Sequence, residues 1–274
     1  MSQPNTNEQK PLSDLMNDPH IVALRYKMIA EPGVRFENPP PIDHEAPSFR
    51  LKLENGWLTA EMKDHFGTIE DARKQVDDFL AAWELSASID QNRKIFAFEY
   101  AHADIVDRQP SPEKQKAIRR LQTTFTFSFI ADESELAVFA HLPPPPANYS
   151  HVEEVNAMWN RYQKSIEGEE PIASMAYFCL SLMENKAGGR SNAATMFGIE
   201  KDVLNKLGQL TSAVGDLKTA RKGSATSSLR AHTPTEIDWM KNAVRECIRR
   251  MGNLHPLSVP APHPLSMKEL PPLS

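Results

Sequence analysis

The residues best spaced for chemistry lie in one short segment, 99–108. If this segment is a β-strand, Tyr100, His102 and Asp104 share one face of it. An imidazole and a carboxylate two residues apart can bind a divalent metal, and two other histidines could complete the shell, His65 and His141. The sequence favours a simpler interpretation, a polar strand end that emerges into solvent. A metal-dependent enzyme that uses His102 and Asp104 is therefore an alternative, and we predict no metal.

Other enzyme signatures are missing from the sequence. There is no phosphate-binding glycine loop, Cys-x-x-Cys pair, His-Glu-x-x-His or Gly-x-Ser-x-Gly. The two cysteines, Cys179 and Cys247, lie in helical apolar patterns without a basic neighbour, so we expect core residues rather than nucleophiles. Two cysteines make no disulfide framework, which fits a reducing, cytoplasmic compartment. The sequence predicts a non-enzymatic protein without a cofactor.

A second pattern, Arg190–Leu207, resembles the helix-turn-helix motif over the full length of that motif. Ala194 supplies the small residue where two short helices cross, and Gly198 lies where the turn needs a positive φ. Five apolar residues occupy the positions that pack such a pair onto a third helix: Ala193, Phe197, Ile199, Leu204 and Leu207. The resemblance implies a helix-turn-helix-like bundle.

The surroundings of this pattern are basic. Residues 1–169 carry a net charge of −9, whereas residues 170–252 carry +4. A polyanion such as double-stranded DNA would bind most readily to the basic half. The candidate DNA-binding residues are Lys201, Asn205, Lys206, Lys218, Arg221, Lys222, Arg230, Lys241, Arg245 and Arg249.

Two observations keep a second function open. Glu200 and Asp202, near the start of the second helix, oppose phosphate, and a basic stripe such as Lys241, Arg245 and Arg249 is often only a solvated face. We therefore expect a DNA-associated regulatory or accessory protein, with a protein–protein adaptor as the alternative. In an adaptor, for example a subunit of a bacterial defence or regulatory complex, the bundle would be only structural.

A wider run of residues carries a further resemblance. The segments Ala176–Leu180 and Gly188–Arg190, followed by Ala193 and Ala194, are similar to a pattern in uncharacterised bacterial proteins. This resemblance covers about the last hundred residues. It implies a bacterial origin and brings no known activity.

The first half of the chain predicts an α+β domain over residues 19–142. The clearest signal is a hairpin in which Asn55-Gly56 joins Phe49–Glu54 to Trp57–Met62, with both strands alternating in phase. Thr68 caps a following helix that buries Ala72, Val76, Phe79, Leu80 and Trp83. We expect a third strand near Ile95–Val106, and a second hairpin from Thr123–Ile130 to Glu135–His141. The domain is therefore an antiparallel sheet with a packed helix.

The second half predicts a helical domain over residues 150–252, beyond a proline spacer at 143–149. Ser150 with Glu153, and Thr233 with Glu236, form capping boxes, and Ile172–Lys186 is apolar enough to be the central helix. We expect residues 1–18 and the proline-rich tail, 253–274, to be disordered. The tail contains a four-residue repeat: His-Pro-Leu-Ser occurs at 255–258 and 263–266, and Pro-Pro-Leu-Ser at 271–274. Its alternative role is therefore that of a docking peptide for a protein partner.

No membrane contact is expected. The first ten residues are polar and do not resemble a signal peptide. The longest apolar stretch, Ile172–Met183, is too short to span a bilayer. The sequence therefore predicts a soluble protein.

Overall fold

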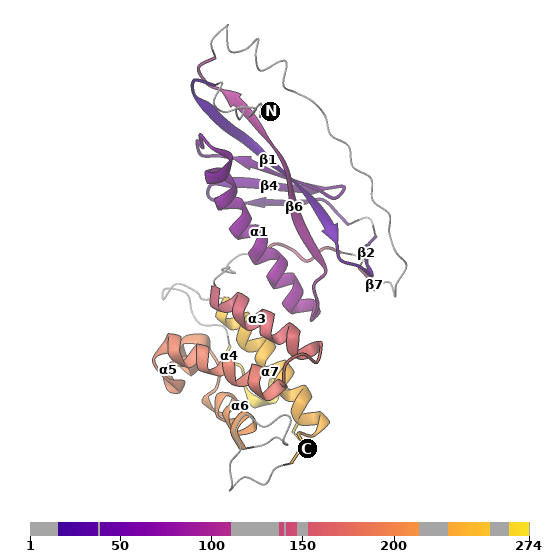
Figure 1. Cartoon of the computed structure of the whole chain (residues 1–274), viewed down its shortest axis with the longest axis vertical. Helices are drawn as coiled ribbons and strands as arrows, with labels where there is room; N and C mark the ends of the chain where they lie inside the picture. Colours follow the sequence, from indigo (N-terminus) through magenta and orange to yellow (C-terminus); the bar gives the residue numbers. More distant parts are fainter. Residues whose placement is uncertain are drawn as a thin grey trace, which may run out of the picture. The chain divides into compact units, whose positions relative to one another are not determined.

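The structure is a computed structural model that describes residues 16–37, 39–110, 137–139, 141–146, 153–213, 230–252 and 263–273. It has an α+β fold, as the sequence predicts: strands and one long helix come first, and several helices follow (Figure 1). The chain divides into two compact units. One contains residues 1–84 and 95–145, and the other contains residues 85–94 and 146–274.

The sheet of the first unit has five strands in the order β3-β4-β5-β1-β6. The hairpin of β4 (Phe49–Glu54) and β5 (Trp57–Met62) has the predicted register, with Phe49 opposite Met62 and Glu54 opposite Trp57. Asn55 and Gly56 both have positive φ, 54° and 75°, which is what a two-residue turn of this type needs. β3 (Ile42–Glu45) pairs with β4 and forms one edge of the sheet.

Helix α1 (Ile69–Gln91) lies along one face of this sheet (Figure 1). The Thr68 hydroxyl accepts a 3.2 Å hydrogen bond from the Asp71 amide, which confirms the predicted cap. The predicted stripe faces the sheet: Ala72, Val76, Leu80 and Trp83 are buried, and Phe79 packs edge-on against Phe49. Amphipathic spacing was therefore sufficient to place this helix.

The long central strand β1 (Pro19–Ala30) pairs antiparallel with both β5 and β6 (Phe96–Asp107). The sequence predicted β6 but not β1. The β1–β6 ladder contains two register shifts, one between Ile21 and Ala23 and the other between Arg25 and Tyr26. At the second shift Arg25 pairs with His102 and Tyr26 with Tyr100, so Ala101 is an extra residue in β6.

The predicted second hairpin is not supported where it can be compared with the structure. Residues 137–139 do form a strand, β7 (Ala137–Phe139), within the predicted range. However, β7 pairs parallel with β2 (Val34–Phe36), at a register that places Phe36 beside Phe139. The predicted first half of the hairpin, 123–130, lies outside the described residues.

The second unit is helical. Helices α4 (Ile172–Ala187) and α7 (Pro234–Gly252) contact each other, and each also contacts α3 (Glu153–Ile166), α5 (Arg190–Phe197) and α6 (Lys201–Ala213). The sequence predicted one central helix, Ile172–Lys186, whereas in the structure α4 and α7 are both central. Gly188 ends α4 in the left-handed conformation, and the Thr233–Glu236 capping box is present. Ser150 lies outside the described residues. No described helix is long and apolar enough to cross a membrane.

The helical core also contains residues from beyond the predicted domain limits of 150–252. Leu85 and Ile89, from the last turns of α1, belong to the same buried cluster as Trp159, and so do Leu265 and Leu270 from the tail. The proline spacer marks only one of the points at which the chain passes between units, because the others lie at residues 84–85 and 94–95.

Candidate functional site

The Arg190–Leu207 segment has helix-turn-helix geometry. Helix α5 ends at Phe197, Gly198 adopts the left-handed conformation (φ 61°, ψ 46°), and α6 begins three residues later. A side chain with a Cβ is disfavoured at this φ, so glycine is the residue that fits the turn. All five predicted packing residues are buried: Ala193, Phe197, Ile199, Leu204 and Leu207. The fully buried small residue is Ala193, whereas Ala194 is only partly buried.

Helix α6 has one buried and one open face. Val203, Leu204, Leu207 and Leu210 are buried in the bundle. The exposed residues recur at helical spacing and are all polar: Lys201, Asp202, Asn205, Gln209 and Ser212. Lys206 is half-buried beside them and donates a 3.2 Å hydrogen bond to Gln209. In a helix-turn-helix, this second helix is the one that enters the DNA major groove.

Arg190 connects the two helices of the motif. Its Nε donates to Glu184 at 2.5 Å, and its Nη1 lies 3.4 Å from the Asn205 Oδ1. A Cβ on Gly208 would lie 2.9 Å from the same guanidinium group, so this side chain covers the glycine. Arg190 thus holds α6 against α4 and α5. The two lysines, Lys201 and Lys206, lie on the open face of α6.

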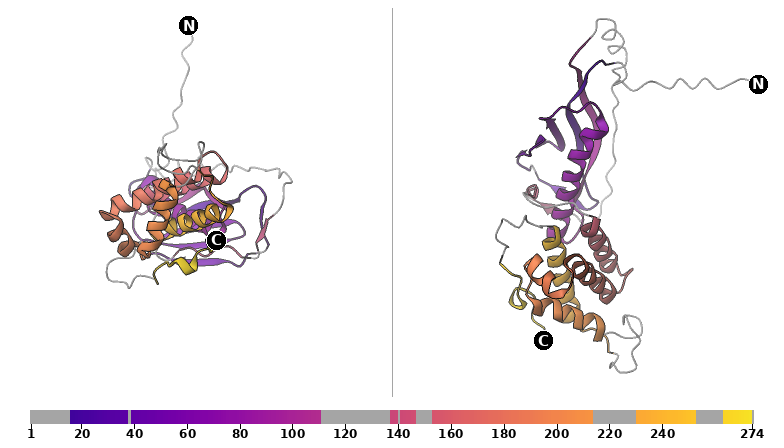
Figure 2. Two further views of the ribbon diagram at one scale, coloured as in Figure 1. Left: turned by 90° about the horizontal axis from the view of Figure 1, so that it is seen from below. Right: turned by 90° about the vertical axis from the view of Figure 1, so that its left-hand side faces the viewer.

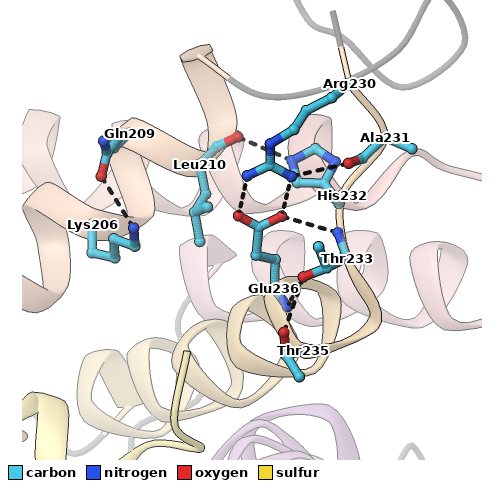
Figure 3. Close-up of polar contacts among 9 residues, drawn as sticks. All are labelled: Lys206, Gln209, Leu210, Arg230, Ala231, His232, Thr233, Thr235 and Glu236. Atoms are coloured by element: carbon cyan, nitrogen blue, oxygen red, sulfur yellow. Dashed lines mark hydrogen bonds and ion pairs between the residues drawn. The ribbon is translucent and has the colours of Figure 1, made fainter. Parts of the chain in front are cut away.

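Arg230, a predicted DNA contact, is exposed and bonds to neighbouring residues of the same chain (Figure 3). Its two terminal nitrogens donate to the two carboxylate oxygens of Glu236 at 2.7 and 2.6 Å, and Nη1 also donates to the Ala231 carbonyl. Glu236 also accepts a hydrogen bond from the Thr233 amide. The hydrogen bonds from Arg230 hold the pKa of Glu236 at about 2. This bidentate pair fixes the chain where it enters α7, and it occupies both terminal nitrogens of the Arg230 guanidinium group.

His232 ties the same segment to the end of α6. Its Nε2 lies 3.1 Å from the Leu210 carbonyl oxygen, and the side chain is buried (Figure 3). Leu210 is in the last turn of α6, where carbonyls lack an intrahelical partner. The Arg230–Glu236 pair thus fixes the start of α7, and His232 joins that start to the end of α6.

The predicted basic stripe on α7 is not a solvated face. Lys241, Arg245 and Arg249 are all only partly exposed. Arg245 donates to Asn242 at 3.0 Å, and Arg249 forms ion pairs with Asp90 at 2.8 Å and with Glu246. Neighbouring Arg250, which the sequence did not single out, binds two backbone carbonyls. Lys218, Arg221 and Lys222 lie outside the described residues.

Part of the proline-rich tail packs on the turn between α5 and α6, which differs from the expected disorder. Leu265 forms a parallel bridge with Ile199, and Leu265 and Leu270 are buried. Burial of two leucines offsets part of the conformational entropy lost by ordering the segment. The segment 263–273 is drawn in yellow in Figure 2.

The structure does not bring together the residues of the alternative metal site. The extra residue at Ala101 reverses the alternation of β6, so Tyr100 does not share a face with His102 and Asp104. Tyr100 packs on Tyr26 and under Arg73 of α1, whereas Asp104 pairs with Arg25 at 3.1 Å on the other face. His65 stacks on His20 instead, and His141 is exposed. Among the described residues, no three His, Cys, Asp or Glu side chains are grouped to hold a metal.

One pocket of about 190 Å³ lies where α1 crosses β1 and β6. Tyr26 donates a 2.6 Å hydrogen bond to Asp77, and Arg73 forms an ion pair with the same carboxylate at 2.8 Å. Burial and the contact with Asp77 raise the pKa of Tyr26. The Tyr26–Asp77 hydrogen bond attaches α1 to the sheet.

Both cysteines are core residues. Cys179 and Cys247 are completely buried, and burial raises the pKa of Cys247 to about 12 and also raises that of Cys179. A protonated, inaccessible thiol is a poor nucleophile.

No protein-family model matches the chain, and neither a curated protein nor a solved structure is significantly similar to it. The geometry of the helical unit therefore carries the functional argument.

Proposed function

We propose that the protein associates with double-stranded DNA through α6, as a non-enzymatic regulatory or accessory protein. The observation that supports this is the open face of α6. On a helix-turn-helix scaffold, its exposed residues are polar and none of the described ion pairs involves its two lysines, Lys201 and Lys206.

The side chains on this face match the chemistry of base edges. Asn and Gln amides can bond in bidentate fashion to adenine, and Lys can bond to guanine or to phosphate. Asn205 and Gln209 are one helical turn apart on the exposed face, with Lys201 one turn before them. Glu200 and Asp202 are exposed near the helix start and would repel phosphate there. We therefore expect modest affinity for random sequences.

A salt-resolved titration of the full chain with duplex DNA tests this proposal. Each phosphate contact contributes about 0.9 to the slope of log affinity against log salt. If Lys201 and Lys206 contact phosphate, changing both to Ala should flatten the slope by about 1.8. Glu200→Gln should strengthen non-specific binding, because it removes repulsion.

The matched control is Lys74→Ala with Lys164→Ala, which removes the same charge from exposed positions on α1 and α3. The control should keep the wild-type slope. If a folded chain does not retain duplex DNA even at low salt, or if both pairs flatten the slope equally, α6 is not a DNA-binding element.

A protein–protein adaptor is the second candidate. The observation in its favour is the packing of an extended, proline-rich segment on the α5–α6 turn. Extended peptides commonly bind through backbone hydrogen bonds with side-chain pockets beside them. An adaptor should bind a protein partner with a salt dependence much weaker than that of DNA, and Lys201→Ala should leave that binding unchanged.

A further inference from the structure

The tail segment joins the helix-turn-helix through a reciprocal pair of backbone hydrogen bonds. The Leu265 amide donates to the Gly198 carbonyl at 2.8 Å, and the Glu200 amide donates to the Leu265 carbonyl at 2.9 Å. Glu200 immediately precedes α6, where amides lack an intrahelical partner. The turn therefore presents one acceptor and one donor to an extended chain, as the edge of a sheet does.

Arg250 of α7 holds the turn and the segment together. Its Nη1 donates to the Gly198 carbonyl at 2.5 Å, and its Nη2 donates to the His263 carbonyl at 3.0 Å. Both acceptors are backbone atoms, so this clamp requires an extended backbone and no particular side chain. The clamp therefore provides affinity, and sequence selectivity must come from the side chains of the segment.

Two leucines supply that selectivity. Leu265 and Leu270 are buried in the helical core cluster, together with Phe197 and Ile199 of the motif. Between them the chain turns through a short 3-10 helix, Met267–Glu269. A capping box closes this helix, in which the Ser266 amide donates to the Glu269 carboxylate at 2.7 Å. The box fixes the spacing at which the two leucines enter the core.

The three repeats of the tail are not equivalent for this site. The middle repeat, 263–266, has Glu269 three residues and Leu270 four residues after its serine. The first repeat has Ala261 and Pro262 at those positions. Only the middle repeat therefore combines the capping box with the second leucine. The pattern that fits the site is Pro-Leu-Ser-x-x-Glu-Leu.

We propose that the α5–α6 turn and Arg250 form a peptide-binding site for protein segments of the pattern Pro-Leu-Ser-x-x-Glu-Leu. Residues 263–273 occupy this site within the chain, and a partner protein with the same pattern binds when it displaces them. Residues 253–262 join the segment to α7, and a short linker gives an effective concentration in the millimolar range. The inner segment is therefore a strong competitor. The inference goes beyond the proposed DNA contact and does not depend on it.

The test uses a fluorescently labelled peptide of residues 261–274 and the full chain. The variant Leu265→Ala with Leu270→Ala removes both buried side chains of the inner segment and keeps the full length of the chain. We expect the segment to leave the site in this variant, which is called the emptied chain. The emptied chain should bind the peptide, and wild type should bind it at least about tenfold more weakly, because its own segment competes. A peptide of residues 253–262, which holds the first repeat alone, should bind the emptied chain at least about tenfold more weakly, because it lacks the second buried leucine.

Two arginine variants of the emptied chain provide the specificity control. Arg250→Ala should abolish peptide binding, whereas Arg245→Ala, on the same helix but without a contact to the segment, should not change it. If the emptied chain is folded and does not bind the peptide, or if Arg250→Ala leaves binding intact, the segment is a fixed part of the fold and the proposal is wrong.

If the emptied chain does not fold, NMR spectroscopy of the wild-type chain tests the same proposal. A large excess of unlabelled peptide should shift the amide resonances of the labelled chain's own Leu265 and Leu270 if it displaces the inner segment, because the Leu265 amide then loses its hydrogen bond to Gly198. Unchanged resonances at millimolar peptide would overturn the proposal.

Discussion

Replacing Glu236 by Gln should destabilise the helical unit by about 2 kcal/mol. The change keeps the shape of the side chain but removes the charge that Arg230 binds with two nitrogens. It also weakens the acceptor for the Thr233 amide in the capping box. Loss of such a cap costs about 1 kcal/mol. A hydrogen-bonded ion pair adds about 1 kcal/mol here, since Arg230 is 48% exposed and solvent screens the pair.

The effect should depend on pH in a defined direction. The hydrogen bonds from Arg230 lower the pKa of Glu236 from 4.5 to about 2 in the folded protein. A depressed carboxyl pKa stabilises the fold above the unfolded pKa, and that stability is lost as the pH falls through the folded value. The difference between wild type and Glu236→Gln should therefore be full at about pH 6, smaller at about pH 3 and nearly gone at about pH 2.

Urea denaturation followed by far-UV circular dichroism measures this difference at each pH. Glu167→Gln is the matched control, because Glu167 is exposed just beyond α3 and should stay within about 0.5 kcal/mol of wild type. A Glu236→Gln protein as stable as the control would refute the proposed clamp. A difference that stays constant from about pH 6 to about pH 2 would refute its ionic part.

Three further predictions concern the core and the turns. Ala193→Leu should cost about 1–3 kcal/mol, because a larger side chain has no room at a fully buried position, and thermal unfolding would show it. Gly56→Ala should destabilise the hairpin by about 1–2 kcal/mol, because Gly56 has a φ of 75°; unfolding by denaturant measures the cost. Cys179 and Cys247 should react with a thiol reagent at neutral pH only after denaturant is added, and prompt labelling of the native protein would contradict their burial.

Local patterns in the sequence predicted the elements whose partners are close along the chain. The register of the β4–β5 hairpin follows from Asn55-Gly56 and the alternation on each side. The turn at Gly198 and the five packing residues around it follow from the spacing of the motif. In each case the sequence pattern and the residues whose positions it predicts lie in the same short segment.

Features that depend on distant partners were missed. Strand β1 has four consecutive apolar residues, Ile21–Leu24, because a bulge interrupts its alternation, so its sequence lacks the usual strand period. No local pattern in the sequence indicates the bulge at Ala101. Because of this bulge, Tyr100 and His102 do not share the strand face that the sequence predicted. The carboxylate partners of Arg230 and Arg249 were not predicted, because net charge cannot show which arginines form ion pairs within the chain.

The core of the helical unit has a consequence for how the protein is made. Leu85 and Ile89 enter this core from the first half of the chain, and Leu265 and Leu270 enter it from the tail. A ribosome extends a chain by roughly 5–20 residues per second, so many seconds separate the synthesis of these two pairs. The helical core cannot be completed until Leu270 has left the ribosome, whereas the sheet residues up to Asp107 emerge well before it. A nascent chain arrested before Leu265 would expose apolar surface and become a substrate for chaperones and proteases.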